Sequence, residues 1–360
     1  MGLTRYAKLT GQGGLVQSDV MSEYLEFLYS LKKYMPFQAY GMPVGISISR
    51  PDDLEYMGLQ HHVTIDYTYP IVDNIYMMGK IAGAHMLGEL YARGLSVCDK
   101  MMMQVSMPAS WEYCVFSSLL VRGYKDCAKN AGAQWAGNRH FRWPTSCIIG
   151  GIASTHCQPK EYISPDKAVA GDVLLLTKAL GIQEVLNAHE CMKKKSERCA
   201  QWLRLSQIVS EDEVRAAFLQ AMRSMVRLNR VAARLMHKHN AHGAAHIGFL
   251  GLLAYAQSLV AVQKQAVSFV IDTLPVIGKM AAVAKANANA NGDKCPLLQG
   301  LSAETSGGLL ICMPREDAVA FCKDIKREDD YPAWIIGRVE SGNRKATITE
   351  NPSVIDVYFP

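Results

Sequence analysis

A stretch near the middle of the chain, CQPKEYISPDKAVAGD from Cys157 to Asp172, constrains the fold more than any other feature of the sequence. It contains two prolines and several residues that favour turns, and it interrupts a chain of 360 residues, which is long enough for two domains. Segments with the spacing of strands and segments with the spacing of helices occur on both sides of it. We therefore expect two domains, and because each mixes helices with strands, both are predicted to be α+β.

The expected division is an N-terminal arm and helix over 1–38, a first domain over 39–158, a linker over 159–171 and a second domain over 172–360. Alternating apolar residues predict the strands of the first domain, and apolar residues at helical spacing predict helices over 74–94 and 111–130. The strands expected there are VGISIS, HVTIDY, MMMQVSM and SCIIGGIAST.

In the second domain the same patterns predict helices at about 183–198 and 211–239, and another that begins at Arg315. The strands expected there are DVLLLTK, VSFVID, GGLLICMP, AWIIGRVE, KATITE and SVIDVYF. A further helix, VIGKMAAVAKA, is expected to end in a loop at NANANGD, because repeated asparagine favours turns.

Composition excludes several classes of protein. Lys and Arg total 38 against 33 acidic residues, and no dense basic block is interleaved with aromatic residues, which argues against a nucleic-acid partner. The longest apolar run, Ile247–Ala256, is too short to span a bilayer. The ten cysteines stand singly, without CxxC spacing, and the N-terminus lacks the apolar run of a signal peptide. We therefore expect a cytoplasmic protein with reduced thiols and no membrane partner.

Four segments carry a resemblance to a known family. The segments are DYTYPIVDNIYMMGKIAGAHMLGELYARG, CQPKEYISPDKAVAGDVLLLTKALG, AETSGGLLICMPREDAVAFC and AWIIGRVESGNR. The chain resembles eukaryotic selenophosphate synthetases from about residue 5 to its C-terminus. The resemblance implies a PurM-like α+β fold, in which an N-terminal α/β domain forms a β-barrel with its twin in a dimer and a C-terminal α+β domain follows.

The same resemblance implies an activity, the formation of selenophosphate, AMP and orthophosphate from selenide, ATP and water. In the family, Mg²⁺ ions held by aspartates neutralise the polyphosphate, and a reactive Cys or selenocysteine lies near a Lys in the N-terminal segment. Hard oxygen ligands and cations are the groups that phosphoryl transfer requires. Each of these positions can be read in this sequence.

Several of the positions have lost their chemistry. In TGQGGLVQSD, Gln12 stands at the reactive position and Leu15 at the Lys. Gln12 cannot form a thiolate, and Leu15 has no charge to meet a phosphate. Ser47 replaces the first metal-binding Asp, and a neutral hydroxyl is a weak substitute for a carboxylate.

Two acidic positions remain. Asp66 keeps one metal-binding position of the family, and Glu89 replaces another Asp in HMLGELYARG, where His85 replaces an Asn. Glu89 keeps the charge but moves the carboxylate outward by one methylene, which the strict geometry of Mg²⁺ disfavours. The resemblance therefore assigns Asp66 and Glu89 to a residual magnesium site.

The nucleotide loop of the family aligns with AGNRHF. Gly137 is kept, Asn138 adds a side chain where the backbone should approach the nucleotide, and Arg139 stands where a phosphate partner is conceivable, although an ordinary exposed Arg is the favoured interpretation. Asp66, Gly137, Asn138 and Arg139 are the candidates for a residual nucleotide site.

The segment NAHGAAHIGFLGLLAYA carries His242 and His246 four positions apart, a spacing that suits a metal pair on a helix. A zinc site would need further ligands, so packing and hydrogen bonding are the favoured roles. The resemblance places His246 on a metal-binding Asp, and an imidazole is a poor ligand for Mg²⁺.

These substitutions favour a catalytically inactive, selenophosphate synthetase-like pseudoenzyme that acts as an interaction or structural subunit. Its partner would be a second copy, an active relative in a heterodimer, or a larger assembly, and no cofactor is expected. Two alternatives stay open. One is a selenide, water dikinase with a rewired site, and the other is a sensor that binds Mg-ATP without turnover.

Overall fold

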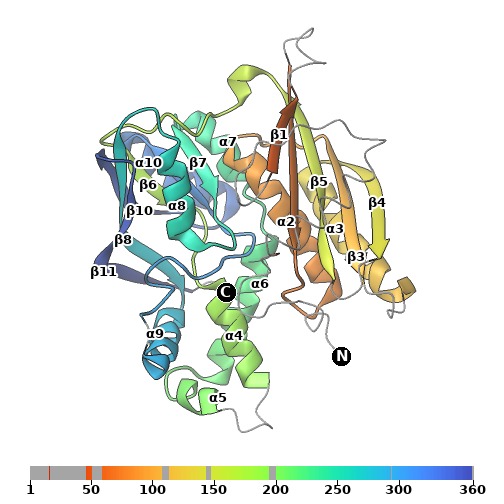
Figure 1. The fold of residues 1–360 in the computed structure, drawn as a ribbon, viewed down its shortest axis with the longest axis vertical. Helices are drawn as coiled ribbons and strands as arrows, with labels where there is room; N and C mark the ends of the chain where they lie inside the picture. The colour runs from red at the N-terminus through yellow and green to blue at the C-terminus, as the bar shows by residue number, and fades with distance from the viewer. Residues whose placement is uncertain are drawn as a thin grey trace. The chain divides into compact units, whose positions relative to one another are not determined.

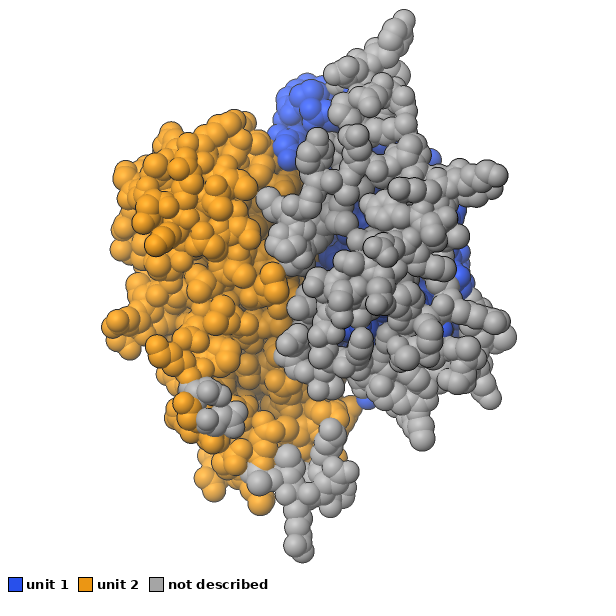
Figure 2. Space-filling view, viewed as in Figure 1, with its two compact units in different colours: residues 1–10, 14–90, 97–162 blue, residues 11–13, 91–96, 163–360 orange. Residues whose placement is uncertain are grey.

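The computed structural model describes residue 16 and residues 46–50, 59–107, 113–142, 147–193, 200–292 and 294–358. Two compact units divide the described residues (Figure 2). Unit 1 includes 46–50, 59–90 and 97–162, and unit 2 includes 91–96 and 163–358. The change from unit 1 to unit 2 at residue 163 falls inside the stretch 159–171 that was expected to be a linker. The expected first helix, Gln12 and Leu15 lie outside the described residues.

Unit 1 contains a five-stranded sheet in the order β1-β2-β5-β3-β4 (Figure 1). All neighbours pair antiparallel except β3 and β4, which are parallel. The strands are β1 (Ile46–Arg50), β2 (Gln60–Thr68), β3 (Lys100–Met107), β4 (Gln134–Arg142) and β5 (Ile148–Cys157). The helices are α2 (Ile75–Ala92) and α3 (Tyr113–Ala131), and the 3-10 turn η4 (Pro159–Glu161) follows the sheet.

Two glycines let α2 and α3 approach closely. A Cβ atom on Gly79 of α2 would overlap the carbonyl oxygen of Leu120, and one on Gly123 of α3 would overlap that of Tyr76. On the sheet side, Thr64 Oγ1 donates to the carbonyl oxygen of Met86 at 3.2 Å, which ties β2 to α2. These contacts fix α2, and with it the side chains that α2 presents to the sheet.

Unit 2 contains a six-stranded sheet in the order β11-β8-β10-β6-β9-β7 (Figure 1). The strands are β6 (Val173–Leu176), β7 (Gly243–His246), β8 (Val267–Ile277), β9 (Leu309–Met313), β10 (Trp334–Ser341) and β11 (Ala346–Val357). The helices are α4 (Ile182–Lys193), α5 (Ala200–Leu205), α6 (Glu211–Val226), α7 (Arg230–Lys238), α8 (Gly251–Ala261), α9 (Met280–Asn291) and α10 (Arg315–Asp329). Within the described ranges, no helix is long and apolar enough to cross a membrane.

Some expected boundaries in unit 2 were wrong. The asparagine repeat NANAN belongs to α9, which ends at Asn291 and is capped by Gly292 with φ 72°. Buried Val283, Ala284 and Ala288 hold α9 against its surroundings, and this packing outweighs the turn preference of asparagine. The residues expected as two C-terminal strands form one strand, β11, with a register shift between Ile348 and Ser353.

Two expected helices also differ from the structure. The helix expected over 211–239 is divided into α6 and α7, because the chain leaves the helical conformation at Arg227 (φ −71°, ψ 128°). The helix expected at 183–198 is described as α4 up to Lys193. At this break the backbone oxygen of Arg227 accepts a hydrogen bond from the buried Lys178.

Candidate functional site

Asp66 lies on β2 and faces α2. Its Oδ2 is 2.9 Å from Nε2 of His85, and its Oδ1 accepts a 2.7 Å hydrogen bond from the backbone N–H of Tyr67. The side chains of His85 and Asp66 are only 3% and 10% exposed. Each carboxylate oxygen of Asp66 therefore already has a protein partner, and little water reaches either group.

The other two candidate metal positions lie in neighbouring elements. Glu89 is half-buried and stands one turn after His85 on the same face of α2. Ser47 is on β1, where it pairs in register with Thr64 of β2. Asp66 and Thr64 are two residues apart and share a face of the strand. The structure thus brings Asp66 into contact with His85. Ser47 and Glu89 are related to that pair only by strand register and by helical spacing.

Three of the candidate nucleotide residues, Gly137, Asn138 and Arg139, were expected in a loop, and this was wrong, because they lie in β4 at one edge of the sheet. Trp135 pairs with Met101 and Asn138 with Met103, so two residues of β4 stand opposite one residue of β3. Gly137 lies in this bulge with φ 101°, a conformation that glycine adopts most readily. A Cβ atom there would meet no atom within 4 Å.

Asp66 and Arg139 do not share a site. Tyr67, which follows Asp66, points to the opposite face of the sheet and bonds to Gln104 through its hydroxyl. Arg139 pairs in register with Gln104, so Arg139 lies on that opposite face, and it is exposed. Asn138 pairs in register with Met103, on the face that carries Asp66, and its side chain contacts the ring of His140. The four residues assigned to a residual nucleotide site are therefore divided between two faces.

His242 and His246 were considered as a metal pair on a helix, and the structure contradicts that placement. His246 ends β7, and the residues from 242 to 246 run in extended backbone that pairs with β9. Four residues of strand span about 13 Å, too far for two imidazoles to share one ion. His242 Nδ1 lies 2.7 Å from Oδ2 of Asp172, and His246 is 2% exposed.

The turn after His246 packs on the ETSGG segment, residues 304–308. The backbone N–H of Ile247 donates to Gly308, that of Gly307 donates to Ile247, and that of Glu304 donates to Gly248. Phe249, which stands at a glycine of the family pattern, is 4% exposed. The rewritten turn is thus part of the core of unit 2.

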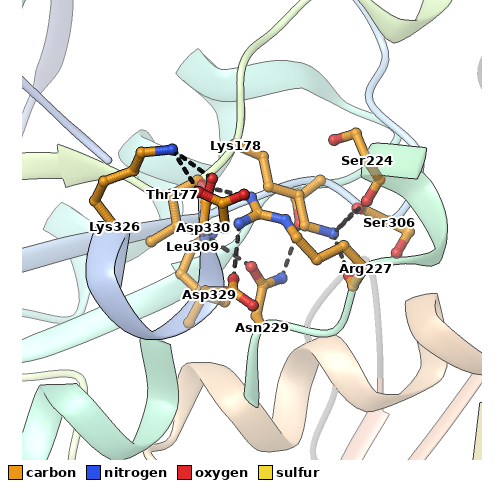
Figure 3. Close-up of polar contacts among 11 residues, drawn as sticks. Thr177, Lys178, Ser224, Arg227, Asn229, Ser306, Leu309, Lys326, Asp329 and Asp330 are labelled. Carbon is orange, nitrogen blue, oxygen red and sulfur yellow. Dashed lines mark hydrogen bonds and ion pairs between the residues drawn. The ribbon is translucent and has the colours of Figure 1, made fainter. Parts of the chain in front are cut away.

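Unit 2 contains a buried cation cluster, Lys178 and Arg227, which the sequence analysis missed (Figure 3). Lys178 is 2% exposed. Its Nζ donates to the backbone oxygens of Ser224 at 2.9 Å, Arg227 at 2.7 Å and Ser306 at 2.7 Å. A lysine immediately after the apolar strand DVLLLT was the available signal.

Arg227 forms the other half of the cluster. It donates through Nη1 to Asp329 at 2.8 Å and through Nη2 to the backbone oxygen of Thr177 at 2.6 Å, and it lies 4.3 Å from the ring centroid of Tyr331. Burial lowers the pKa of Arg227 and raises the pKa of Asp329, so desolvation outweighs their attraction.

Lys178 and Arg227 donate the hydrogen bonds of this cluster to backbone oxygens and to the carboxylate of Asp329. Lys178 neutralises carbonyl groups at the C-terminal end of α6, where cations are favoured. A small pocket borders the cluster, and it is lined by Lys178, Ala179, Gln220, Ser224, Arg227, Ile277, Tyr331, Pro332 and Trp334. We interpret the cluster as a brace between α6 and the ETSGG segment rather than as a ligand site.

A second buried ionisable group caps α4. The carboxylate of Glu304 is 1% exposed and accepts the backbone N–H groups of Gly181 at 2.6 Å and Ile182 at 3.2 Å. Burial raises the pKa of Glu304 to about 8. Negative charge at a helix N-terminus is favourable, yet the apolar surroundings oppose ionisation here.

The arrangement does not suit a magnesium ion. Among the residues that the structure describes, no three His, Cys, Asp or Glu side chains come close enough together to hold a metal ion. The retained carboxylate of Asp66 is engaged by His85 and Tyr67. The residues present therefore do not fit the metal that the resemblance implied.

Comparison with known proteins identifies the fold. The chain superimposes on thiamine-monophosphate kinase from Stenotrophomonas maltophilia K279a with a TM-score of 0.62 at 17% identity, covering 94% of this chain and 98% of that one. It superimposes on Escherichia coli HypE with a TM-score of 0.58 at 14% identity, covering 91% and 93%. Together with the α+β units, these likenesses show a PurM-like fold.

Sequence comparison is more specific. Residues 169–350 match the family model "AIR synthase related protein, C-terminal domain". The chain is 46% identical over 310 residues to human selenide, water dikinase 2, covering 84% of this chain and 67% of the relative. It spans about two thirds of the human and mouse relatives. It is also 36% identical to the probable selenide, water dikinase of Caenorhabditis elegans, covering 99% of this chain and 93% of that protein. By this nearly full-length match, the chain belongs to the selenide, water dikinase family.

Proposed function

We propose that this chain is a selenide, water dikinase family member that does not catalyse the family's reaction and acts as an interaction or structural subunit. The observation that carries the proposal is the state of Asp66, whose two oxygens are taken by His85 and by the backbone of Tyr67. His246, at another position the resemblance gives to a metal-binding Asp, is buried in a strand.

The physical argument is cumulative. Phosphoryl transfer depends on positioned cations and oxygen ligands, and removal of one such electrostatic contact typically costs about 10²-fold or more in rate. Gln12 and Leu15 supply neither nucleophile nor cation. Several losses of this size together would leave almost no catalytic rate. They therefore support a role as an interaction or structural subunit.

One face of the unit 1 sheet supports self-association or pairing with a relative. Ile65 pairs in register with Ile152, and Ile152 with Met102, so the three form one row across β2, β5 and β3. This row lies on the face opposite Asp66 and α2, and all three side chains are half-exposed. An apolar row of this kind suits burial against a second copy or a related subunit. A neighbour in fold, HypE, has been solved in a HypE–HypF complex, with a TM-score of 0.54 to this chain.

The second candidate function is selenide, water dikinase activity. The names of its relatives favour it, since the human protein is selenide, water dikinase 2 at 46% identity and the nematode protein is a probable selenide, water dikinase at 36% identity. Asp66 and Glu89 keep acidic side chains, which such an enzyme would have to redeploy. A sensor that binds nucleotide without turnover is intermediate between the two.

One pair of measurements separates these functions. AMP formation from ATP is measured by chromatography with Mg²⁺, with and without selenide, and Mg-ATP binding is measured by calorimetry. The proposal predicts neither AMP formation nor Mg-ATP binding, whereas a sensor would bind Mg-ATP without forming AMP. Selenide-dependent AMP would establish the enzyme.

Sedimentation analysis of the wild type and of an Ile152→Glu variant tests the pairing surface, because a buried charge should dissociate the pair.

A further inference from the structure

The imidazole of His85 occupies the space beside Oδ2 of Asp66 that a metal ion bound to this oxygen would need. A buried carboxylate is costly unless a cation or donors meet it. Here Oδ2 of Asp66 faces Nε2 of His85 at 2.9 Å, within a layer where Asp66 and His85 are 9% and 3% exposed. An ion bound to that oxygen would stand at about 2.1 Å from it and would meet the imidazole nitrogen directly.

We propose that His85 has taken over the role of the metal as partner of Asp66, so that one side chain excludes the ion from unit 1. The inference rests on the proposed function and deepens it, because it names the residue that closes the site. By the resemblance, the position of His85 belongs to an Asn, whose shorter amide would not reach as far toward Oδ2 of Asp66. Replacing the imidazole by that amide should reopen the site to a divalent ion.

The fold around the pair allows this test. The position of α2 against the sheet is fixed by the bond from Thr64 to the carbonyl of Met86 and by the close contacts at Gly79 and Gly123. None of these contacts uses the imidazole of His85. Glu89 lies one turn away from His85 on the same face of α2.

The test is a Mn²⁺ titration of the full chain, followed by electron paramagnetic resonance of the free ion. Wild type is expected to bind Mn²⁺ weakly, and His85→Asn to bind it about tenfold more tightly or better. His85→Asn/Asp66→Asn should lose the gain. His62→Asn is the matched control, since it removes another buried imidazole, 6% exposed, that stacks on Tyr162.

A thermal readout accompanies the titration. His85→Asn should melt below wild type and regain part of the difference with millimolar Mn²⁺, while wild type and His62→Asn keep the same melting temperature with and without the ion. Should His85→Asn not fold, His85→Ala is used, because it also removes the imidazole from Oδ2 of Asp66.

Equal Mn²⁺ affinity of wild type and the folded His85 variant, with no thermal shift, would overturn the inference. So would a gain that persists in His85→Asn/Asp66→Asn. Neither result decides the proposed function, which fails if wild type forms AMP from ATP and selenide or binds Mg-ATP. The two failures are therefore distinguishable.

Discussion

Replacing Lys178 by Met should destabilise unit 2 markedly. The variant keeps an unbranched apolar side chain as far as Cε but removes an ammonium that donates to three backbone oxygens at 2.7 to 2.9 Å. Hydrogen bonds from a charged donor contribute about 1.5–3 kcal/mol each, and the relief of desolvation on losing the charge offsets part of that sum. We expect a net loss of about 3 kcal/mol in the free energy of unfolding.

Urea unfolding followed by tryptophan fluorescence measures this loss, since Trp202 and Trp334 both lie in unit 2. Lys264→Met is the matched control. Its ammonium is 3.0 Å from Asp166, but its side chain is 72% exposed, so we expect a change of about 1 kcal/mol or less. Equal losses in the two variants, within about 0.5 kcal/mol, would refute the view that Lys178 braces the end of α6.

Three further predictions concern buried or paired groups. Burial raises the pKa of Glu304 from 4.5 to about 8, so its stabilising contribution is present below pH 4.5 and is lost as pH rises through about 8. Wild type should therefore lose more free energy of unfolding than Glu304→Gln between about pH 5 and pH 9, and parallel pH profiles would contradict this. Hydrogen bonds from Lys238 and His239 lower the pKa of Asp324 to about 2. The stability that Asp324 contributes is therefore present above pH 3.8 and is lost as pH falls through about 2. Acid titration of unfolding should show that loss in wild type and not in Asp324→Asn. Burial raises the pKa of Cys147 to about 12, and mass-spectrometric mapping should find this thiol alkylated only after unfolding, so native labelling would contradict its burial.

Local pattern was sufficient to predict most elements of the fold. The strands β2, β3 and β5 show apolar alternation or apolar runs in the sequence because their side chains are buried in a sheet. The asparagine repeat of α9 was misread, because its turn preference is local while the apolar contacts of Val283 and Ala288 that hold the helix are not.

The site was less predictable. Resemblance identified Asp66 and the substitution at His85, but nothing in the sequence said that the two side chains meet. The strand conformation of β4, which places Asp66 and Arg139 on opposite faces, depends on pairing between segments far apart in the chain. Lys178 was missed for the same reason, since its acceptors lie 46, 49 and 128 positions away.

The most direct test of the account is the formation of AMP by the purified wild-type chain supplied with ATP, Mg²⁺ and selenide, run beside an active family member under the same conditions. Because Asp66 is engaged by His85 and the sequence carries Gln12 and Leu15 in place of a nucleophile and a cation, we predict no AMP above the selenide-free control. Selenide-dependent AMP from the wild-type chain alone would contradict the account.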